Sequence, residues 1–430
     1  MEYKGNRVGD ESTLAQKKPF LHSAVGQTQV CLRVPAVDRI AENGKMGFKT
    51  EWFSTAAEMF SEADVVSANV FLSLPYLNAL ELGGPADAEF RYAVLKSGKK
   101  VLGFYYFQLL PFRLSAMDEM IKDKPYRRLL QTVKSLLDAY LFRTSSMRKS
   151  VLLVSGNMCV SGDHGFSGDN RSAMADALPG LIQELLRSIG ATHRVIAQVV
   201  KDAPESDDPI GAILKSRRFF RLDMDPVMKL RFPQGVSDME GYKTALSSKY
   251  RVRMNQTKKR IEDCQWRDLS LSEMKRYRQD MQHLYSAVQD KAPLKIVQVD
   301  MDYLMALKKN LGDGMRCSAL FLGDRMLAFT TGMQNGEEYE AHHIGLDYEE
   351  NRTRSLYLNI LFRYIEMAFD SGAESVCFGR TALEMKTTVG AVPVYYNAYM
   401  KLSNGFLNGF VRCLLPDPAP HNWIPRSPFR

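Results

Sequence analysis

The clearest alternation of secondary structure lies between His342 and Ala391, in the run HHIGLDYEENRTRSLYLNILFRYIEMAFDSGAESVCFGRTALEMKTTVGA. The run begins in a strand expected over about 338–344. It continues into a long helix from about Arg354 to Ser371, which Gly372 closes. A further strand is expected over 375–378. Strand, helix and strand in this order predict a sheet covered by helices.

A β-hairpin is expected just before this run, because two apolar segments within 317–331 flank a turn at Gly323. An equivalent hairpin, with its turn at Gly98, is expected within 92–107. Each hairpin is followed by a helix and a strand. The recurrence suggests a weak internal duplication, so we expect two halves with one architecture.

The length of 430 residues is too great for one typical core and suits two domains. A hydrophobic fraction of 45% and a charged fraction of 25% exclude a disordered or coiled-coil chain. We expect a poorly ordered lead-in over 1–45 and domains over 46–225 and 226–415. The proline-rich tail, 416–430, should run extended over the surface.

The expected location is the cytoplasm. The longest nearly apolar run, 101–112, is too short to cross a bilayer, and residues 1–20 contain no apolar signal segment. Six scattered cysteines form no C-x-x-C pair, so we expect neither a metal site nor a disulfide framework. A net charge of +8 favours an anionic partner: a phosphate-bearing cofactor, nucleic acid or an anionic membrane surface.

Two arginines, Arg352 and Arg354, fall near the expected N-terminus of the long helix. Cationic side chains oppose the helix dipole there, so their presence is easiest to explain if an anion binds. Neutralisation by Asp347, Glu349 and Glu350 is the alternative explanation. The helix-terminus argument alone does not choose between them.

The motifs of the run resemble the C-terminal acyltransferase domain of the GNAT superfamily, in its FemAB-like and BioF2-like branch. In that branch a polar strand leads to a helix, then to a strand ending in Phe-Gly, then to a Lys-x-x-x-Gly element. The segment YKTALSSKYRVRMNQTKKR, 242–260, also resembles a Leu-Ser-x-Lys-x-Arg helix of the branch. The resemblance covers roughly Phe71 to Lys401. It implies an α/β (α+β) fold of two tandem GNAT-like domains, each a mixed, mostly antiparallel sheet covered by helices.

The resemblance implies an N-acyltransferase that moves an acyl group from a thioester to an amine, such as an aminolipid or long-chain base, with no tightly bound cofactor. Ordinary GNAT enzymes hold pyrophosphate on an Arg/Gln-x-x-Gly-x-Gly/Ala loop, but 349–354 contains no glycine. Acyl-CoA, acyl carrier protein and aminoacyl-tRNA therefore all stay open as donors. The absence of a Gly-x-Ser-x-Gly elbow favours direct transfer.

The candidate general base is His342 or His343, of which at most one should reach a given cleft because strand neighbours face opposite ways. A satisfied core or surface histidine is the alternative. The resemblance adds Glu384 and Lys386 as catalytic candidates, although an exposed ion pair is the favoured explanation for them because charged residues are mostly exposed. Candidate donor-binding residues are Arg352, Arg354, Ser355, Tyr357, Asn359 and Arg380.

Two basic segments bear on the partner. The segment 249–260 contains six cationic side chains and no acid, which suits tRNA phosphates, a carrier protein or lipid headgroups as well as a solvated face. The segment 122–149 combines an apolar stripe with basic residues. That profile fits peripheral contact with an anionic inner membrane surface, or a helix packed on its own sheet.

Two other functions stay open. One is a FemAB-type transferase that takes its group from aminoacyl-tRNA. We expect nucleic acid only in that case, and the helices lack the sustained heptads of a coiled-coil arm. The other is a non-catalytic basic binding module.

Overall fold

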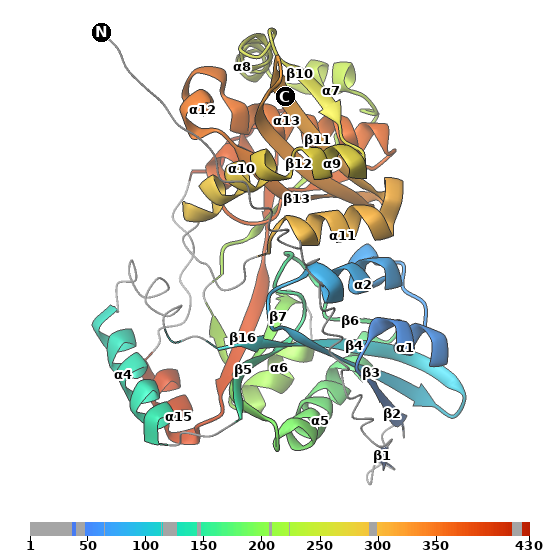
Figure 1. Cartoon of the computed structure of the whole chain (residues 1–430), viewed down its shortest axis with the longest axis vertical. Coiled ribbons are helices and arrows are strands. Elements are labelled where there is room, and N and C mark those ends of the chain that lie inside the picture. The colour runs from blue at the N-terminus through green and yellow to red at the C-terminus, as the bar shows by residue number, and fades with distance from the viewer. Residues whose placement is uncertain are drawn as a thin grey trace, which may run out of the picture. The chain divides into compact units, whose positions relative to one another are not determined.

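The computed structural model describes residues 37–39, 48–63, 65–112, 114, 127–143, 148–205, 209–222, 224–291, 299–414 and 424–430 (Figure 1). Residues Arg33–Arg430 form one compact unit. Most of the expected lead-in, 1–45, lies outside the described residues.

The first sheet contains nine strands among the described residues, in the order β1-β2-β3-β4-β5-β7-β16-β8, with β6 paired to β4. Its strands are antiparallel except for β5 and β7, which run parallel. The strands are β1 (Val37–Arg39), β2 (Phe48–Phe53), β3 (Glu89–Ser97), β4 (Lys100–Pro111), β5 (Lys149–Ser155), β6 (Phe166–Gly168), β7 (His193–Pro204), β8 (Phe220–Leu222) and β16 (Tyr396–Leu402).

The second sheet has the order β10-β11-β12-β13-β14-β9-β15 among the described residues. Here β13 and β14 form the parallel pair. The strands are β9 (Val227–Arg231), β10 (Gln265–Asp268), β11 (Met315–Leu322), β12 (Arg325–Asn335), β13 (Glu338–Leu346), β14 (Ser375–Cys377) and β15 (Val392–Val394). Both expected hairpins are present, and their turn glycines, Gly98 and Gly323, have the positive φ that the turns require.

The helices begin and end where local chemistry favours it. Asp300 caps α11 by accepting the backbone N–H of Asp302, and Gly312 ends that helix with φ of 56°. The helices are α1 (Ala56–Glu62), α2 (Leu74–Gly83), α4 (Arg127–Arg143), α5 (Arg171–Ile189), α6 (Pro209–Ser216), α7 (Met239–Ala245), α8 (Ser248–Lys259), α9 (Leu271–Arg276), α10 (Arg278–Asp290), α11 (Met301–Leu311), α12 (Tyr348–Arg354), α13 (Leu356–Asp370), α14 (Leu383–Thr387) and α15 (Gly405–Leu414), with 3₁₀ turns η1 (Val70–Leu72) and η2 (Gly312–Gly314). Two mixed, mostly antiparallel sheets covered by helices confirm the expected fold class.

The strand β16 joins the first sheet, although its residues fall in the range expected for the second domain. It pairs with β7 and β8, while β9 takes the matching place beside β14 in the second sheet. The apolar pattern of this segment indicates a strand but not which sheet edge completes its hydrogen bonds. The two halves are therefore joined by a strand that crosses from one to the other.

The C-terminal tail differs from the surface run that its prolines suggested. Its last described residues are extended, but the backbone N–H of Ser247 donates to the Pro428 carbonyl at 2.9 Å. The ring of Phe429 packs on Tyr242, with centroids 5.8 Å apart. The tail therefore contributes to the core of the second half.

The amphipathic α4 uses its apolar stripe for internal packing. Val133 and Leu137 are buried in one cluster with Leu407 and Val411 of α15. Of the two interpretations of this segment, packing on the protein itself accounts for these side chains. Among the described helices, none is long and apolar enough to span a membrane.

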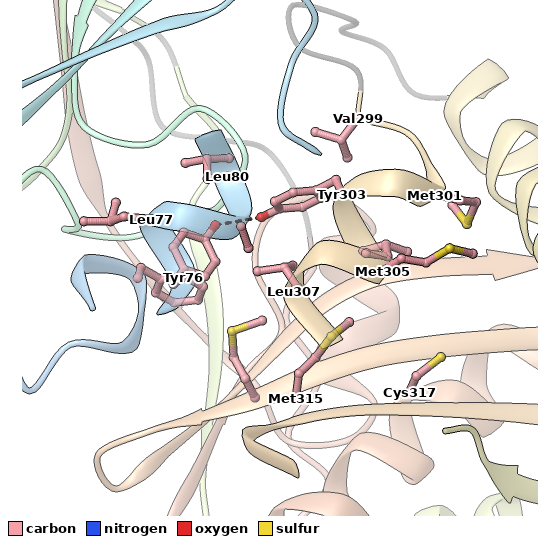
Figure 2. Close-up of a cluster of buried hydrophobic side chains, with 14 of the residues drawn as sticks. Tyr76, Leu77, Leu80, Val299, Met301, Tyr303, Met305, Leu307, Met315 and Cys317 are labelled. Atoms are coloured by element: carbon pink, nitrogen blue, oxygen red, sulfur yellow. Dashed lines mark hydrogen bonds between the residues drawn. The ribbon is translucent and has the colours of Figure 1, made fainter. Parts of the chain in front are cut away.

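A shared hydrophobic core joins the halves where α2 packs against α11 (Figure 2). Within it, the hydroxyls of Tyr76 and Tyr303 lie 2.8 Å apart. The helices approach closely because α2 ends in Gly83, where a Cβ atom would lie 2.8 Å from the Cα atom of Tyr303. The backbone of α11 leaves no room for a side chain at that point.

We expect Gly83→Ala to lower the free energy of unfolding by roughly 1–3 kcal/mol, because the new methyl must push two helix backbones apart. The matched control is Gly409→Ala in α15, where a Cβ atom meets nothing within 4 Å. That control should be neutral or stabilising by up to about 1 kcal/mol. Denaturant titration of both variants measures the difference. Equal stabilities would contradict the close approach of α2 and α11.

Candidate functional site

The second sheet opens where its two parallel strands separate. β13 pairs with β14 only over Glu338–Glu340, and β13 then continues to Leu346. In the first sheet, by contrast, β5 stays paired with β7 over its whole length, Lys149–Ser155. The edge of β13 beyond Glu340 is therefore free of its parallel neighbour, which leaves backbone groups available to a ligand.

A cavity of about 600 Å³ lies at the end of β13. It is bounded by α8, the junction of α12 and α13, and the segment around α14. No aspartate or glutamate is among the described residues that line it. These residues are Arg253, Gln256, Thr257, Arg260, Leu346, Tyr348, Asn351, Ser355, Tyr357, Leu358, Ala382 and Met385.

The helix α13 starts at this cavity. The expected long helix is present as α13, and a single left-handed residue, Ser355 with φ of 51°, separates it from α12, a short helix that the sequence analysis did not expect. The side chain of Asn359 holds the break by donating to the carbonyls of Arg354 at 3.0 Å and Thr257 at 3.2 Å. Asn359 is thus a buried structural residue, with the partners that its burial requires. The positive end of the α13 dipole lies among residues that line the cavity.

Two arginines of the basic α8 segment complete the positive character of the cavity. Arg260 donates to the Ser355 hydroxyl at 2.6 Å. Arg253 lines the cavity and forms no ion pair with any described residue. A helix N-terminus, two guanidinium groups and no carboxylate among the described lining residues make an environment suited to an anion such as phosphate.

Arg352 and Arg354 lie elsewhere than expected. They occupy the last turn of α12, where cationic side chains complement the helix dipole instead of opposing it. Arg354 pairs with Asp263 at 2.5 Å and with Glu350 at 3.0 Å. The premise of an unfavourable arginine pair at a helix N-terminus was therefore wrong, because both arginines belong to a separate helix, α12, that ends at Arg354 before Ser355. The sequence pattern could not reveal that break.

A β-bulge turns both histidines toward one face of the sheet. Ile344 pairs with Thr330 and Ala341 with Gly332, so His342 and His343 share the place opposite the single residue Thr331. Their ring centroids lie 4.2 Å apart. The expectation that only one of them could face a given cleft was wrong, since the bulge cancels the strict alternation of the strand.

A chain of hydrogen bonds fixes the proton on His342. Asn157, whose side-chain oxygen accepts from the Cys159 N–H, donates its amide to the Tyr76 hydroxyl at 3.1 Å. Both tyrosine protons find acceptors only if Tyr76 donates to Tyr303, and Tyr303 to Nε2 of His342 at 3.2 Å. His342 then carries its proton on Nδ1, and this buried atom has no partner among the described residues.

Both histidines are neutral at pH 7. Burial, together with the adjacent His343, holds the pKa of His342 well below its usual range. Burial lowers the pKa of His343 to about 4. Nε2 of His343 is likewise buried without a described partner. The bulge thus places one hydrogen-bond donor and one ring with a free nitrogen side by side, both buried, and neither histidine is among the described residues that line the cavity.

An acidic residue on the same strand, Glu340, was not among the sequence candidates. Burial, and then the charge of Glu338, raise its pKa to about 7, near that of an efficient general base. Glu338, Glu340 and Cys377 bring ligand-type atoms within 4.8 Å of one another. However, Lys229 lies 2.6 Å from Glu338 and already supplies the positive charge that a cation would bring.

Glu384 and Lys386 do not share a cleft. Glu384 is exposed and lies 3.7 Å from Arg426, so its ion pair forms with a different residue from the expected partner, Lys386. Lys386 is buried and donates to the carbonyls of Gly379 at 3.1 Å and Arg380 at 2.5 Å. Burial lowers the pKa of Lys386 to about 7. Arg380 is held by a carboxylate of the first half and does not line the cavity.

The sequence contained a signal for two of the three groups of residues that the sequence analysis missed, and no signal for the third. Glu340 precedes His342 by two positions, so strand alternation places both on one face. Arg253 and Arg260 belong to the basic segment already noted. Tyr76 and Tyr303 come from helices 227 residues apart, and no local pattern pairs them.

Nuclear magnetic resonance of ¹⁵N-labelled histidine should find His342 neutral and protonated on Nδ1, and His343 titrating near pH 4. Tyr303→Phe removes the donor to Nε2, so only in that variant should the His342 nitrogen shifts change strongly. Tyr277→Phe, whose hydroxyl bonds neither histidine, is the control. An Nε2-protonated His342 in the parent would contradict the assigned chain.

Comparisons with known proteins identify a domain and a similar fold. A family model described as an acetyltransferase (GNAT) domain matches residues 248–387. No curated protein matches the sequence. FemX is similar over 84% of this chain and 100% of its own, with 11% identity and a TM-score of 0.51. A tandem GNAT protein from the clavulanic acid biosynthesis pathway covers 82% of this chain and 98% of its own, with 10% identity and a TM-score of 0.46.

The family match spans the cavity, both histidines and the α14 segment, whereas the likeness to FemX concerns the fold of the described chain. A transferase activity follows from the matched domain, while the donor and the acceptor do not. This chain is a transferase that contains an acetyltransferase (GNAT) domain over residues 248–387.

Proposed function

We propose that this protein is an N-acyltransferase that moves an acyl group by direct transfer to an amine from a thioester donor with a phosphate group. Acyl-CoA and acyl carrier protein both fit, because each carries the thiol on a phosphorylated arm. The observation that carries the proposal is the cavity at the start of α13, with two arginines and no acid among its described lining residues.

The donor's phosphate is assigned to Arg253, Arg260 and the first turn of α13. Backbone N–H groups of a first helical turn lack partners within the helix, and a phosphate can accept from those that are not capped. In α13 the N–H of Tyr357 is already capped, since it donates to Oδ1 of Asn351 at 2.9 Å. This arrangement replaces the glycine-rich loop that the sequence lacks. Ser355 and Tyr357 line the same cavity, so these two of the expected donor-binding residues remain in the proposal.

The acyl group is placed against β13 beyond Glu340, on the edge without a parallel partner. The amine nitrogen attacks the thioester carbon, the carbon–sulfur bond breaks, and the proton lost from the amine ends on the thiolate. His342 donates from Nδ1 to the oxygen on which negative charge develops. His343 accepts the proton of the amine through its free ring nitrogen, and Glu340 is the competing base.

The apolar stripe of α4 does not support a lipid acceptor, because its buried side chains pack against the protein itself. An aminolipid or long-chain base as acceptor, near an anionic membrane, is supported only by exposed groups. Arg127 and Arg128 are exposed on α4, and Phe406 of the adjacent α15 is 77% exposed.

The alternative donor is aminoacyl-tRNA. The cationic α8 favours keeping this candidate, because its basic side chains suit tRNA phosphates. The discriminating experiment incubates the purified protein separately with labelled acyl-CoA, acyl carrier protein and charged tRNA. Consumption of charged tRNA alone would replace the thioester proposal.

We expect Arg253→Ala and Arg260→Ala each to weaken CoA binding by about tenfold or more, since a charge-assisted hydrogen bond contributes roughly 1.5–3 kcal/mol. The salt dependence of binding should fall as well. Arg352→Ala, an exposed charge outside the cavity, is the matched control and should bind normally. Isothermal titration at two salt concentrations measures both effects. Normal affinity in both cavity variants would remove the phosphate site.

Replacing His343 with Ala should lower kcat by roughly a hundredfold or more, the usual contribution of a general base. Because a base acts in its unprotonated form, a rate controlled by His343 should hold as pH falls and decline only near pH 4. A decline centred near pH 7 that Glu340→Gln abolishes would assign the base to Glu340 instead. The measurement is kcat/KM against pH for the parent and both variants.

A further inference from the structure

The first half holds its parallel strand pair in the place that corresponds to the open edge of the second half. β5 and β7 remain together through Ser155 and Val200. Beside the end of that pair the space near Lys201 measures only about 10 Å³, room for about one water molecule. The position that receives the donor in the second half is closed in the first.

Lys201 of β7 lines this closed position and is paired with the next residue of the strand, Asp202. Lys201 donates to the Val160 carbonyl at 2.7 Å and to the carboxylate of Asp202. Asp202 is fully buried and accepts the backbone N–H of Gly162 at 2.8 Å. Its φ of 60° is left-handed, a strained conformation for a residue with a side chain.

A guanidinium from the second half completes the cluster. Arg380 donates to both oxygens of Asp202, at 2.7 and 3.1 Å, and through Nε to the Asp225 carbonyl at 2.7 Å. Burial raises the pKa of Asp202, but Lys201 and Arg380 outweigh it and hold the pKa at about 2. The carboxylate therefore stays charged and can hold Arg380 throughout the working pH range.

The loop that carries Arg380 also carries part of the cavity wall. Between β14 and α14, Gly379, Thr381 and Ala382 all have positive φ, of 66°, 68° and 47°. Only glycine adopts this region without strain, so the loop needs contacts outside itself to keep its shape. Lys386 supplies internal bonds, while Arg380 supplies the bond to the other half. Ala382 of this loop lines the cavity.

We propose that Asp202 is a positioning residue for donor binding: the first half has lost its own ligand space and uses that place to hold the cavity wall of the second half. The inference rests on the proposed function, since it concerns the cavity assigned to the donor. Asp202 acts through Arg380 and the loop, without touching the donor. Its loss should therefore change donor affinity more than the rate at saturation.

The test compares Asp202→Asn and Arg380→Gln with the parent. In Arg380→Gln the buried Asp202 carboxylate keeps Lys201 and the N–H of Gly162 as partners. We therefore expect this variant to stay folded even if Asp202→Asn does not. Lys96→Gln removes an ion pair with Glu51 between β2 and β3 of the first half and is the control. We expect faster amide hydrogen exchange over 379–386 in the two test variants without donor. We also expect CoA affinity to weaken by roughly fivefold to a hundredfold, a usual range for coupling between sites, with kcat at saturating donor little changed.

The outcomes separate the two proposals. Failure of the unmodified protein to bind CoA would remove acyl-CoA as the donor and leave acyl carrier protein, while loop exchange would still test the positioning role. A variant with a loosened loop and unchanged CoA affinity would overturn this inference and leave the proposed function standing. Unchanged exchange in either folded variant would also overturn it. Arg380→Lys, which keeps the charge, should recover part of the affinity if the role is positioning.

Discussion

The packing of α2 on α11 is the constraint on which the arrangement of the site depends. It brings Tyr76 of the first half within hydrogen-bonding distance of Tyr303 of the second, inside a core that both halves share. Because the bond is buried, each hydroxyl needs a defined acceptor. Tyr76 therefore donates to Tyr303, and Tyr303 donates to Nε2 of His342, which leaves the His342 proton on Nδ1. A contact between distant helices thereby determines the chemistry offered on β13.

The two halves have the same architecture but differ at the ends of their parallel strands. In the second half the parallel strands separate after Glu340, and a cavity with two arginines lies at the end of β13. In the first half the corresponding strands stay together, and Lys201, paired with Asp202, lines the closed position. Strand β16, supplied by the far end of the chain, completes the first sheet. The first half is in this view a support that reaches the site through Arg380.

Much of the fold could be predicted because its signals are local. Turn glycines such as Gly98 and Gly323, the cap at Asp300 and the periods of the apolar residues placed most elements correctly. The errors share one cause. The break at Ser355 and the bulge at His342 and His343 depend on packing that a local pattern does not contain. Both errors fall at the candidate site, where local preference is most often overruled.

The sequence by itself determined the fold class, the two hairpins and the kinds of residue that reach the site, because hydrophobic period and turn chemistry act over short stretches of chain. Only the tertiary structure decided which groups meet. Arg380 finds Asp202 at a separation of 178 residues, and β16 finds β7 across nearly half the chain. Such pairings are selected by burial: a charge or strand edge removed from water needs whichever partner the packed fold brings within reach.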